Sequence, residues 1–184
     1  LVGSEMCIRD RFHIDALVIT YKNAGIKLDV DSPVEVGSDR ICNCAASVEL
    51  AGTPAIVGDI GSATNYDVIN NEGAFIGGAI APGIDVSGKY LIENASLLKD
   101  TVFNFPKTVI GTSTTTNLQS GIMYGGLYSV YGMIKHIEEE LNEHCKIFLT
   151  GGLSTLISSK LNIKHKVLPN LTLDGLKLIN FEKD

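Results

Sequence analysis

The chain has 184 residues, of which 45% are hydrophobic and 20% charged, which is enough apolar sequence to bury the core of one domain. Its formal net charge of −6 argues against nucleic acid or an anionic membrane as the principal partner. No apolar run is long enough for a transmembrane helix, and the four cysteines are too irregularly placed for a disulfide framework, so we expect a cytoplasmic enzyme domain.

The first segment of the chain, residues 1–11, carries neither a signal-peptide pattern nor a hydrophobic period. The string Met6–Arg11 reads like a translated adapter from a sequencing library, and we therefore predict that residues 1–11 are foreign to the fold. Beyond them, Ala16–Thr20 is a short apolar run that predicts a strand.

The segment Pro33–Arg40 predicts the start of a helix. Gly37 and Ser38 would form the turn and the N-cap, which puts the next two residues in the first turn, where backbone N–H groups and the positive end of the helix dipole lie. Asp39 can stay ionised there as a general base, while Arg40 can form a two-pronged contact with a substrate carboxylate. A capped helix with a surface ion pair is the alternative interpretation.

The middle of the chain alternates between helix and strand patterns. Gly52 and Pro54 end the helix that begins at Arg40. The next three apolar runs predict strands, and the first two of these strands would form a hairpin. Pro82 and Gly83 then break the third strand before a further helix. The predicted ranges are helix 40–50, strands 55–60, 66–69 and 74–80, and helix 84–98.

The last third of the chain opens with a long helix, about residues 115–142. Apolar side chains recur there at a spacing of three or four, at Leu127, Val130, Tyr131, Ile134, Ile137 and Leu141. The run 146–150 predicts a buried strand that delivers two glycines to another helix. Taken alone, this succession of elements indicates only an α/β fold.

One candidate phosphate and cation site follows the strand 55–60. Asp59 lies near its end with Gly61 directly behind, so the carboxylate can sit at the edge of a cleft and hold a cation. The backbone after Gly61 and the hydroxyls of Ser62 and Thr64 can then face phosphate oxygens. A simple hairpin turn is the alternative interpretation.

Two later positions are also candidates. Gly151 and Gly152 follow a buried strand and would let the backbone approach a nucleotide closely, although an ordinary strand-to-helix turn would use the same residues. Thr114 precedes the long helix as a candidate for its N-cap, a role that Thr115 could share.

Six blocks of the chain resemble the motifs of type III pantothenate kinases, and they occur in the same order over most of the sequence. The blocks are Pro33–Arg40, similar to P-x-E-V-G-A-D-R, then Asp59–Thr64, Gly77–Gly83, Val109–Thr114, Thr150–Gly152 and Leu171–Leu176. Single glycine-rich turns are common, but six in register make a specific match. Ser38 replaces the usual alanine, and Ser62 and Asn65 replace usual threonines.

The resemblance implies an actin-like ATPase fold of the sugar-kinase and Hsp70 class. It implies ATP-dependent phosphorylation of pantothenate to 4'-phosphopantothenate, the first step of coenzyme A synthesis, by a homodimer whose substrate site lies close to the dimer interface. It also implies Mg²⁺ with the ATP, and a monovalent cation, potassium or ammonium. The residues that inherit roles are Asp39 for catalysis, Gly37, Ser38, Asp39, Arg40 and Thr114 for pantothenate, Gly61, Ser62, Thr64, Gly151 and Gly152 for ATP, and Asp59 for the cation.

The family's first block, D-x-G-N-T on a preceding domain, has no match in this chain. We therefore expect the C-terminal part of a two-domain kinase, with residues 12–32 as a remnant of the first domain and 33–184 as the second domain, inactive as given. Two alternatives remain, a non-catalytic accessory transcription regulator related to the family and another small-molecule kinase of the actin-like class. The presence of Asp39, Arg40, Asp59 and Thr114 favours the pantothenate kinase.

Overall fold

The computed structural model describes residue 13 and residues 17–95 and 101–181. Segment 1–11, predicted to be foreign to the fold, lies outside these described residues. Two short 3-10 turns, η1 and η2, precede the helices and strands of the fold. The bounds are η1 Tyr21–Asn23, η2 Pro33–Glu35, α2 Ser38–Ala51, β1 Ala55–Ile60, β2 Ala63–Ile69, β3 Phe75–Pro82, α3 Ile84–Glu93, α4 Thr114–Leu141, β4 Lys146–Thr150, α5 Ser154–Ser158, β5 Lys166–Val167 and α6 Leu171–Phe181.

The strands form one mixed sheet in the order β3-β2-β1-β4-β5. β1 pairs antiparallel with β2 and parallel with β4, so the loops that follow β1 and β4 leave the sheet at the same edge. The backbone N–H of Leu153, just after β4, donates to the carbonyl of Ile60 at the end of β1 over 3.0 Å. The glycines that follow these two strands are thereby brought close together.

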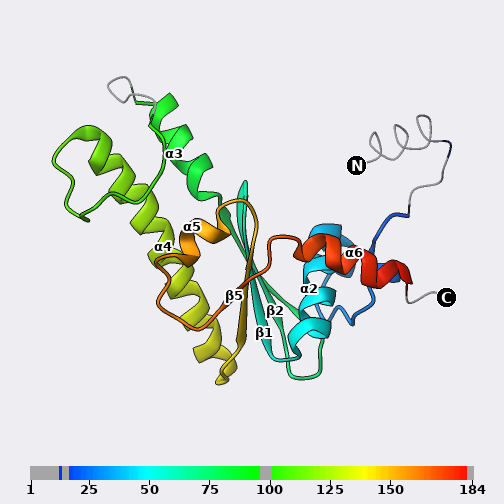
Figure 1. Cartoon of the computed structure of the whole chain (residues 1–184). Helices are drawn as coiled ribbons and strands as arrows, with labels where there is room; N and C mark the ends of the chain where they lie inside the picture. Colours follow the sequence, from blue (N-terminus) through cyan, green and yellow to red (C-terminus); the bar gives the residue numbers. More distant parts are fainter. Residues whose placement is uncertain (1–12, 14–16, 96–100, 182–184) are drawn as a thin grey trace.

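Helices cover both faces of the sheet, with α3, α4 and α5 on one side and α2 and α6 on the other (Figure 1). The α4 face has its own apolar core, in which Met123, Leu127 and Val130 pack against Ile56 and Tyr66 of the sheet. The α2 face carries two helices that lie close to each other, because Gly175 of α6 packs against the backbone of Cys42. Its core includes Cys44, Ala46, Val57, Phe75, Phe148 and Leu171.

The alternation of side chains along β1 and β2 decides which residues reach the α2 face. Tyr66 is buried among the apolar residues under α4, and its neighbour Asp67 contacts Arg40 of α2. Successive side chains of a strand point to opposite faces, so Asn65 shares the α2 face with Asp67, and Thr64 shares the α4 face with Tyr66. On β1, Val57 packs in the α2-face core and Asp59 contacts Asn43 of α2.

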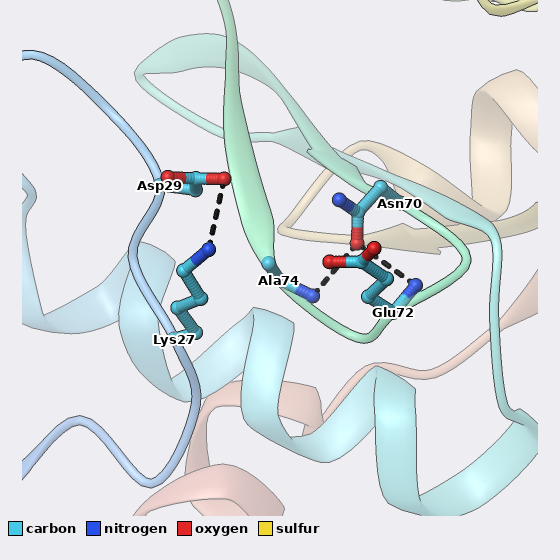
Figure 2. Close-up of polar contacts among 5 residues, drawn as sticks. All are labelled: Lys27, Asp29, Asn70, Glu72 and Ala74. Atoms are coloured by element: carbon cyan, nitrogen blue, oxygen red, sulfur yellow. Dashed lines mark hydrogen bonds and ion pairs between the residues drawn. The ribbon is translucent and has the colours of Figure 1, made fainter.

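The turn between β2 and β3 is closed by one asparagine. The side-chain oxygen of Asn70 accepts from the backbone N–H groups of Glu72 and Ala74 over 3.0 and 2.9 Å (Figure 2). Beside this turn, the segment that carries the ion pair of Lys27 and Asp29 lies along the start of β3 (Figure 2). The carbonyl of Lys27 accepts from the N–H of Phe75 over 2.9 Å, which fixes the start of β3.

Most predicted elements are confirmed, and the differences have local causes. The fold class is α/β as predicted, and the strands 55–60 and 146–150 have the predicted bounds. The predicted strand Ala16–Thr20 is wrong over its described part, residues 17–20, because Thr20 caps the turn η1 and Ile19 is buried against α2 and α6. The helix predicted to run to 98 ends at Glu93, where the side chain of Asn94 donates to the carbonyl of Tyr90.

Candidate functional site

The first turn of α2 presents the residues predicted to meet a substrate. Gly37 is the N-cap of α2, without a side-chain cap, and the hydroxyl of Ser38 donates instead to the carbonyl of Ile19 over 2.6 Å. The carboxylate of Asp39 accepts from the backbone N–H of Arg40 over 2.9 Å and is otherwise exposed. The positive end of the helix dipole attracts a negative group in this turn, and the exposed carboxylate is open to a ligand.

Arg40 is held from two sides. Its Nε donates to Oδ1 of Asp67 over 2.6 Å, and its guanidinium carbon lies 5.2 Å from the centre of the Phe75 ring. The side chain of Asp67 is fully buried, while that of Arg40 keeps 16% of its surface exposed. The arginine therefore bridges a buried acid and the solvent-facing start of α2.

Asp59 is fixed by a second polar contact from α2. The amide nitrogen of Asn43 donates to Oδ2 of Asp59 over 3.2 Å, and the Asn43 oxygen accepts from the hydroxyl of Thr172 over 2.7 Å. Burial raises the pKa of Asp59, and the hydrogen bond from Asn43 partly opposes that shift. The chain of contacts joins α6, α2 and the end of β1.

Backbone glycines close around the carboxylate of Asp59. Gly151 has a positive φ of 86°, and a Cβ atom there would lie 2.7 Å from the backbone of Ile60 and would also collide with Oδ1 of Asp59. At Gly152 a Cβ atom would meet nothing within 4 Å. One glycine is therefore required by packing against β1, and the other borders open space.

Three carboxylates influence one another in this region. The pKa of Asp67 is raised to about 6, because burial and the charges of Asp39 and Asp59 raise it by more than the nearby Arg40 lowers it. Within the described residues, no group of three or more His, Cys, Asp or Glu side chains is arranged to hold a metal ion. The three acids therefore act on one another as separate charged groups.

The structure brings together most of the predicted site. Gly37, Ser38, Asp39 and Arg40 form the start of α2, and Asp59, with Gly61 and Gly151, lies at the end of β1 on the same face. Ser62 is exposed in the turn between β1 and β2, and its carbonyl accepts from the N–H of Gly83 over 3.1 Å.

Two predicted residues lie elsewhere. Thr64 is buried on the α4 face, where it lines a cavity of about 280 Å³ with Tyr66 and Gly125. Thr114 is exposed at the start of α4, which projects beyond the sheet on the side away from α2 (Figure 1). The N-cap of α4 is Ser113, which shares a capping box with Thr116, so neither Thr114 nor Thr115 has that alternative role.

The sequence interpretation missed three residues of the site, Asn43, Asp67 and Thr172. The available signal was a polar residue inside an apolar pattern. Asn43 lies among the small apolar residues of α2 and Asp67 within the apolar end of β2, and each is fully buried. A buried amide or acid needs a partner, so each position indicated a specific contact.

The family model for type III pantothenate kinase matches residues 3–136. The chain belongs to the type III pantothenate kinase family. The match includes most of segment 1–11, whose origin stays a prediction.

Relatives named type III pantothenate kinase are similar over most of the chain. The one from Frankia alni is 42% identical over 160 residues, which are 87% of this chain and 64% of the relative. The one from Halalkalibacterium halodurans is 40% identical over 176 residues, 95% of this chain and 69% of the relative. The chain therefore spans about two thirds of the length of these kinases.

A solved structure shows the same fold at lower sequence identity. A protein described as a Baf family transcriptional activator from Campylobacter jejuni superposes with a TM-score of 0.63 at 22% identity, over 89% of this chain and 72% of that one. Among the residues that the structure describes, no helix is long and apolar enough to cross a bilayer.

Proposed function

We propose that this chain is the pantothenate-binding part of a cytoplasmic kinase that transfers the γ-phosphoryl group of ATP to pantothenate, giving 4'-phosphopantothenate. The observation that carries the proposal is the start of α2, where an exposed acid and an anchored arginine lie side by side, in a chain of this family. Phosphoryl transfer mainly needs positioned groups and neutralised charge, which these residues can supply.

In this proposal, Asp39 accepts the proton of the attacking hydroxyl. The carboxylate is exposed and hydrogen-bonded to the N–H of Arg40, so it is oriented without being enclosed. Arg40 binds the carboxylate of pantothenate, because a guanidinium pairs with a carboxylate through two parallel hydrogen bonds. The two residues would thus hold opposite ends of one acceptor molecule.

Asp59 is the proposed contact for a monovalent cation, potassium or ammonium. Its carboxylate has a pKa raised by burial, and a cation beside it would favour the ionised form. A bound cation, with Mg²⁺ carried by the nucleotide, would offset the negative charge of the ATP phosphates. Gly61, Ser62, Gly151 and Gly152 would offer backbone and hydroxyl contacts to the nucleotide from the adjoining loops.

In this proposal, Thr114 joins the site through a second copy of the chain. It begins a helix on the opposite side of the sheet from α2, so one chain does not bring it to Asp39 (Figure 1). We therefore propose a homodimer in which one copy contributes Thr114 to the pantothenate site of the other. A change of Thr114 to Val should then raise the KM for pantothenate without altering the KM for ATP.

The direct test uses the complete open reading frame from the source genome, expressed and purified. We expect ADP release that depends on pantothenate and that increases when sodium is replaced by potassium. The Asp39→Asn variant should lose the pantothenate-dependent ADP release and, with it, the response to potassium. A matched control is Asp85→Asn, which removes an acid from an exposed ion pair with Lys89 on α3.

The same preparation separates the alternatives. Turnover with a sugar or acetate but not with pantothenate would point to another kinase of the class. Absence of turnover with all three acceptors, together with specific retention of promoter DNA in a gel-shift assay, would favour an accessory regulator and reject the kinase.

A further inference from the structure

The buried carboxylate of Asp67 is the polar group at this site to which the proposed reaction gives no role. Its side chain has no exposed surface, and its Oδ1 lies 2.6 Å from Nε of Arg40. Its second oxygen, Oδ2, is buried without a hydrogen-bond partner among the described residues. A lone acid placed deep in the sheet and joined to one arginine calls for an explanation.

We infer that Asp67 is a positioning residue, which orients the guanidinium of Arg40 so that its two terminal amino groups face the carboxylate of pantothenate. This inference rests on the proposed function, because it assigns the way in which that site recognises its substrate. Asp67 touches neither substrate in this scheme and acts through Arg40.

The geometry of the pair supports this role. A guanidinium offers five N–H donors in one plane, and donation through Nε uses one edge of the plane while leaving Nη1 and Nη2 for a second acceptor. Among the described residues, the hydrogen bond recorded from the Arg40 side chain is the one that Nε makes to Asp67. The terminal nitrogens therefore stay available to a carboxylate with the right spacing.

The orientation of the guanidinium plane is restrained too, in addition to the Nε edge that Asp67 holds. The Phe75 ring lies 5.2 Å from the guanidinium carbon, and Phe75 is itself fixed by backbone hydrogen bonds with Lys27 and Asp29. A ring and a buried acid together restrict rotation about the last bonds of the arginine. A restrained side chain loses less conformational entropy when it binds a ligand.

The surrounding charges explain why a third acid is needed. Asp39 and Asp59 both lie close enough to raise the pKa of Asp67, the acid that contacts Arg40. Without Asp67, Arg40 would be free to pair with one of these carboxylates and would cover groups assigned to the acceptor hydroxyl and the cation. Asp67 draws the guanidinium into the sheet and keeps it apart from them.

The test measures steady-state kinetics of the complete protein with four variants: Asp67→Asn, Arg40→Lys, their double variant and the control Asp29→Asn. The control removes an acid from the exposed ion pair with Lys27. In Asp67→Asn we expect the KM for pantothenate to rise by about 10–100-fold, as for loss of a charge-assisted hydrogen bond. The kcat and the KM for ATP of this variant should stay within about threefold of the wild-type values. Asp29→Asn should match the wild type.

The double variant distinguishes positioning from general support of the fold. If Asp67 acts through the fork of Arg40, then Asp67→Asn should change the KM for pantothenate less than about threefold in the Arg40→Lys background. Independent effects that multiply in the double variant would overturn the inference, as would an unchanged KM for pantothenate in Asp67→Asn. Equal losses in kcat and in both KM values would also overturn it, because they indicate a structural role.

If Asp67→Asn does not fold, Asp67→Glu replaces it, and a KM for pantothenate within threefold of the wild type would overturn the inference. If the wild-type protein shows no pantothenate-dependent ADP release, the proposed function fails first. An active wild type with an unchanged Asp67→Asn variant rejects only the positioning role.

Discussion

The side chain of Asn43 donates to Oδ2 of Asp59 over 3.2 Å, so a buried amide of α2 fixes the carboxylate at the end of β1. The same amide accepts from Thr172 of α6 over 2.7 Å. Because both ends of Asn43 are used, the contact ties the proposed cation ligand to the packing of two helices. A change that removes the Asn43 amide should therefore be felt at Asp59.

Asn43→Ala should lower the free energy of unfolding by about 1–3 kcal/mol, because it leaves the Asp59 carboxylate and the Thr172 hydroxyl without a partner. It should also raise the potassium concentration needed for half-maximal activity. Urea denaturation and a potassium titration measure the two effects. Thr172→Val is the matched control, since it keeps the contact with Asp59, and a potassium requirement altered equally by both variants would contradict the proposed link.

Asp39→Asn should reduce kcat by about 10²–10⁴-fold, the range expected for loss of a general base, with little change in ATP affinity. The amide can still accept from the N–H of Arg40, so the helix start should persist. Pantothenate-dependent ADP release measures kcat, and circular dichroism checks the fold. Turnover at the wild-type rate would exclude Asp39 as the base.

Asp67 should make the protein less stable as the pH rises from about 4 to 6. Its pKa is raised from 3.8 to about 6 in the folded protein, so the folded state binds more protons than the unfolded state over this interval, and stability falls with rising pH. The loss should be at most about 3 kcal/mol, from the size of the shift. The groups that act on Asp67 are Arg40, Asp39 and Asp59.

The measurement is urea denaturation of the wild type and Asp67→Asn at several pH values. The difference between the two curves isolates Asp67, because the other acids titrate in both proteins. We expect the wild type to lose stability relative to Asp67→Asn as the pH rises through this interval. A difference that is constant between pH 4 and 7 would show that Asp67 has an ordinary pKa.

Gly151→Ala should destabilise the protein by about 1–3 kcal/mol, because φ at this position is 86° and a Cβ atom would meet the backbone of Ile60. It should also weaken nucleotide binding by displacing the carboxylate of Asp59. Gly152→Ala is the matched control, since a Cβ atom there meets nothing within 4 Å. Thermal denaturation and the KM for ATP measure both effects, and equal losses in the two variants would contradict the packing argument.

The sequence by itself determined the local elements and the identity of the residues at the start of α2. Two predicted elements, the strand Ala55–Ile60 and the long helix with apolar residues at a spacing of three or four, are confirmed. Both depend mainly on neighbouring residues in the chain. The run Ala16–Thr20 shows the limit of this approach. Of its described residues, Ile19 is buried against α2 and α6 while Leu17 and Val18 are exposed, and none of them joins the sheet, which no local period distinguishes from a strand.

Only the tertiary structure decided which polar residues meet. The pairs Arg40–Asp67 and Asn43–Thr172 join residues far apart in the sequence, and they depend on which face of β2 and which side of α2 each residue occupies. The same alternation separated Thr64 from Asp59, although both belong to one sequence block. Periodicity fixes the order of side chains within an element, but the contacts between elements follow from how the sheet and helices pack, because that packing decides which faces come together.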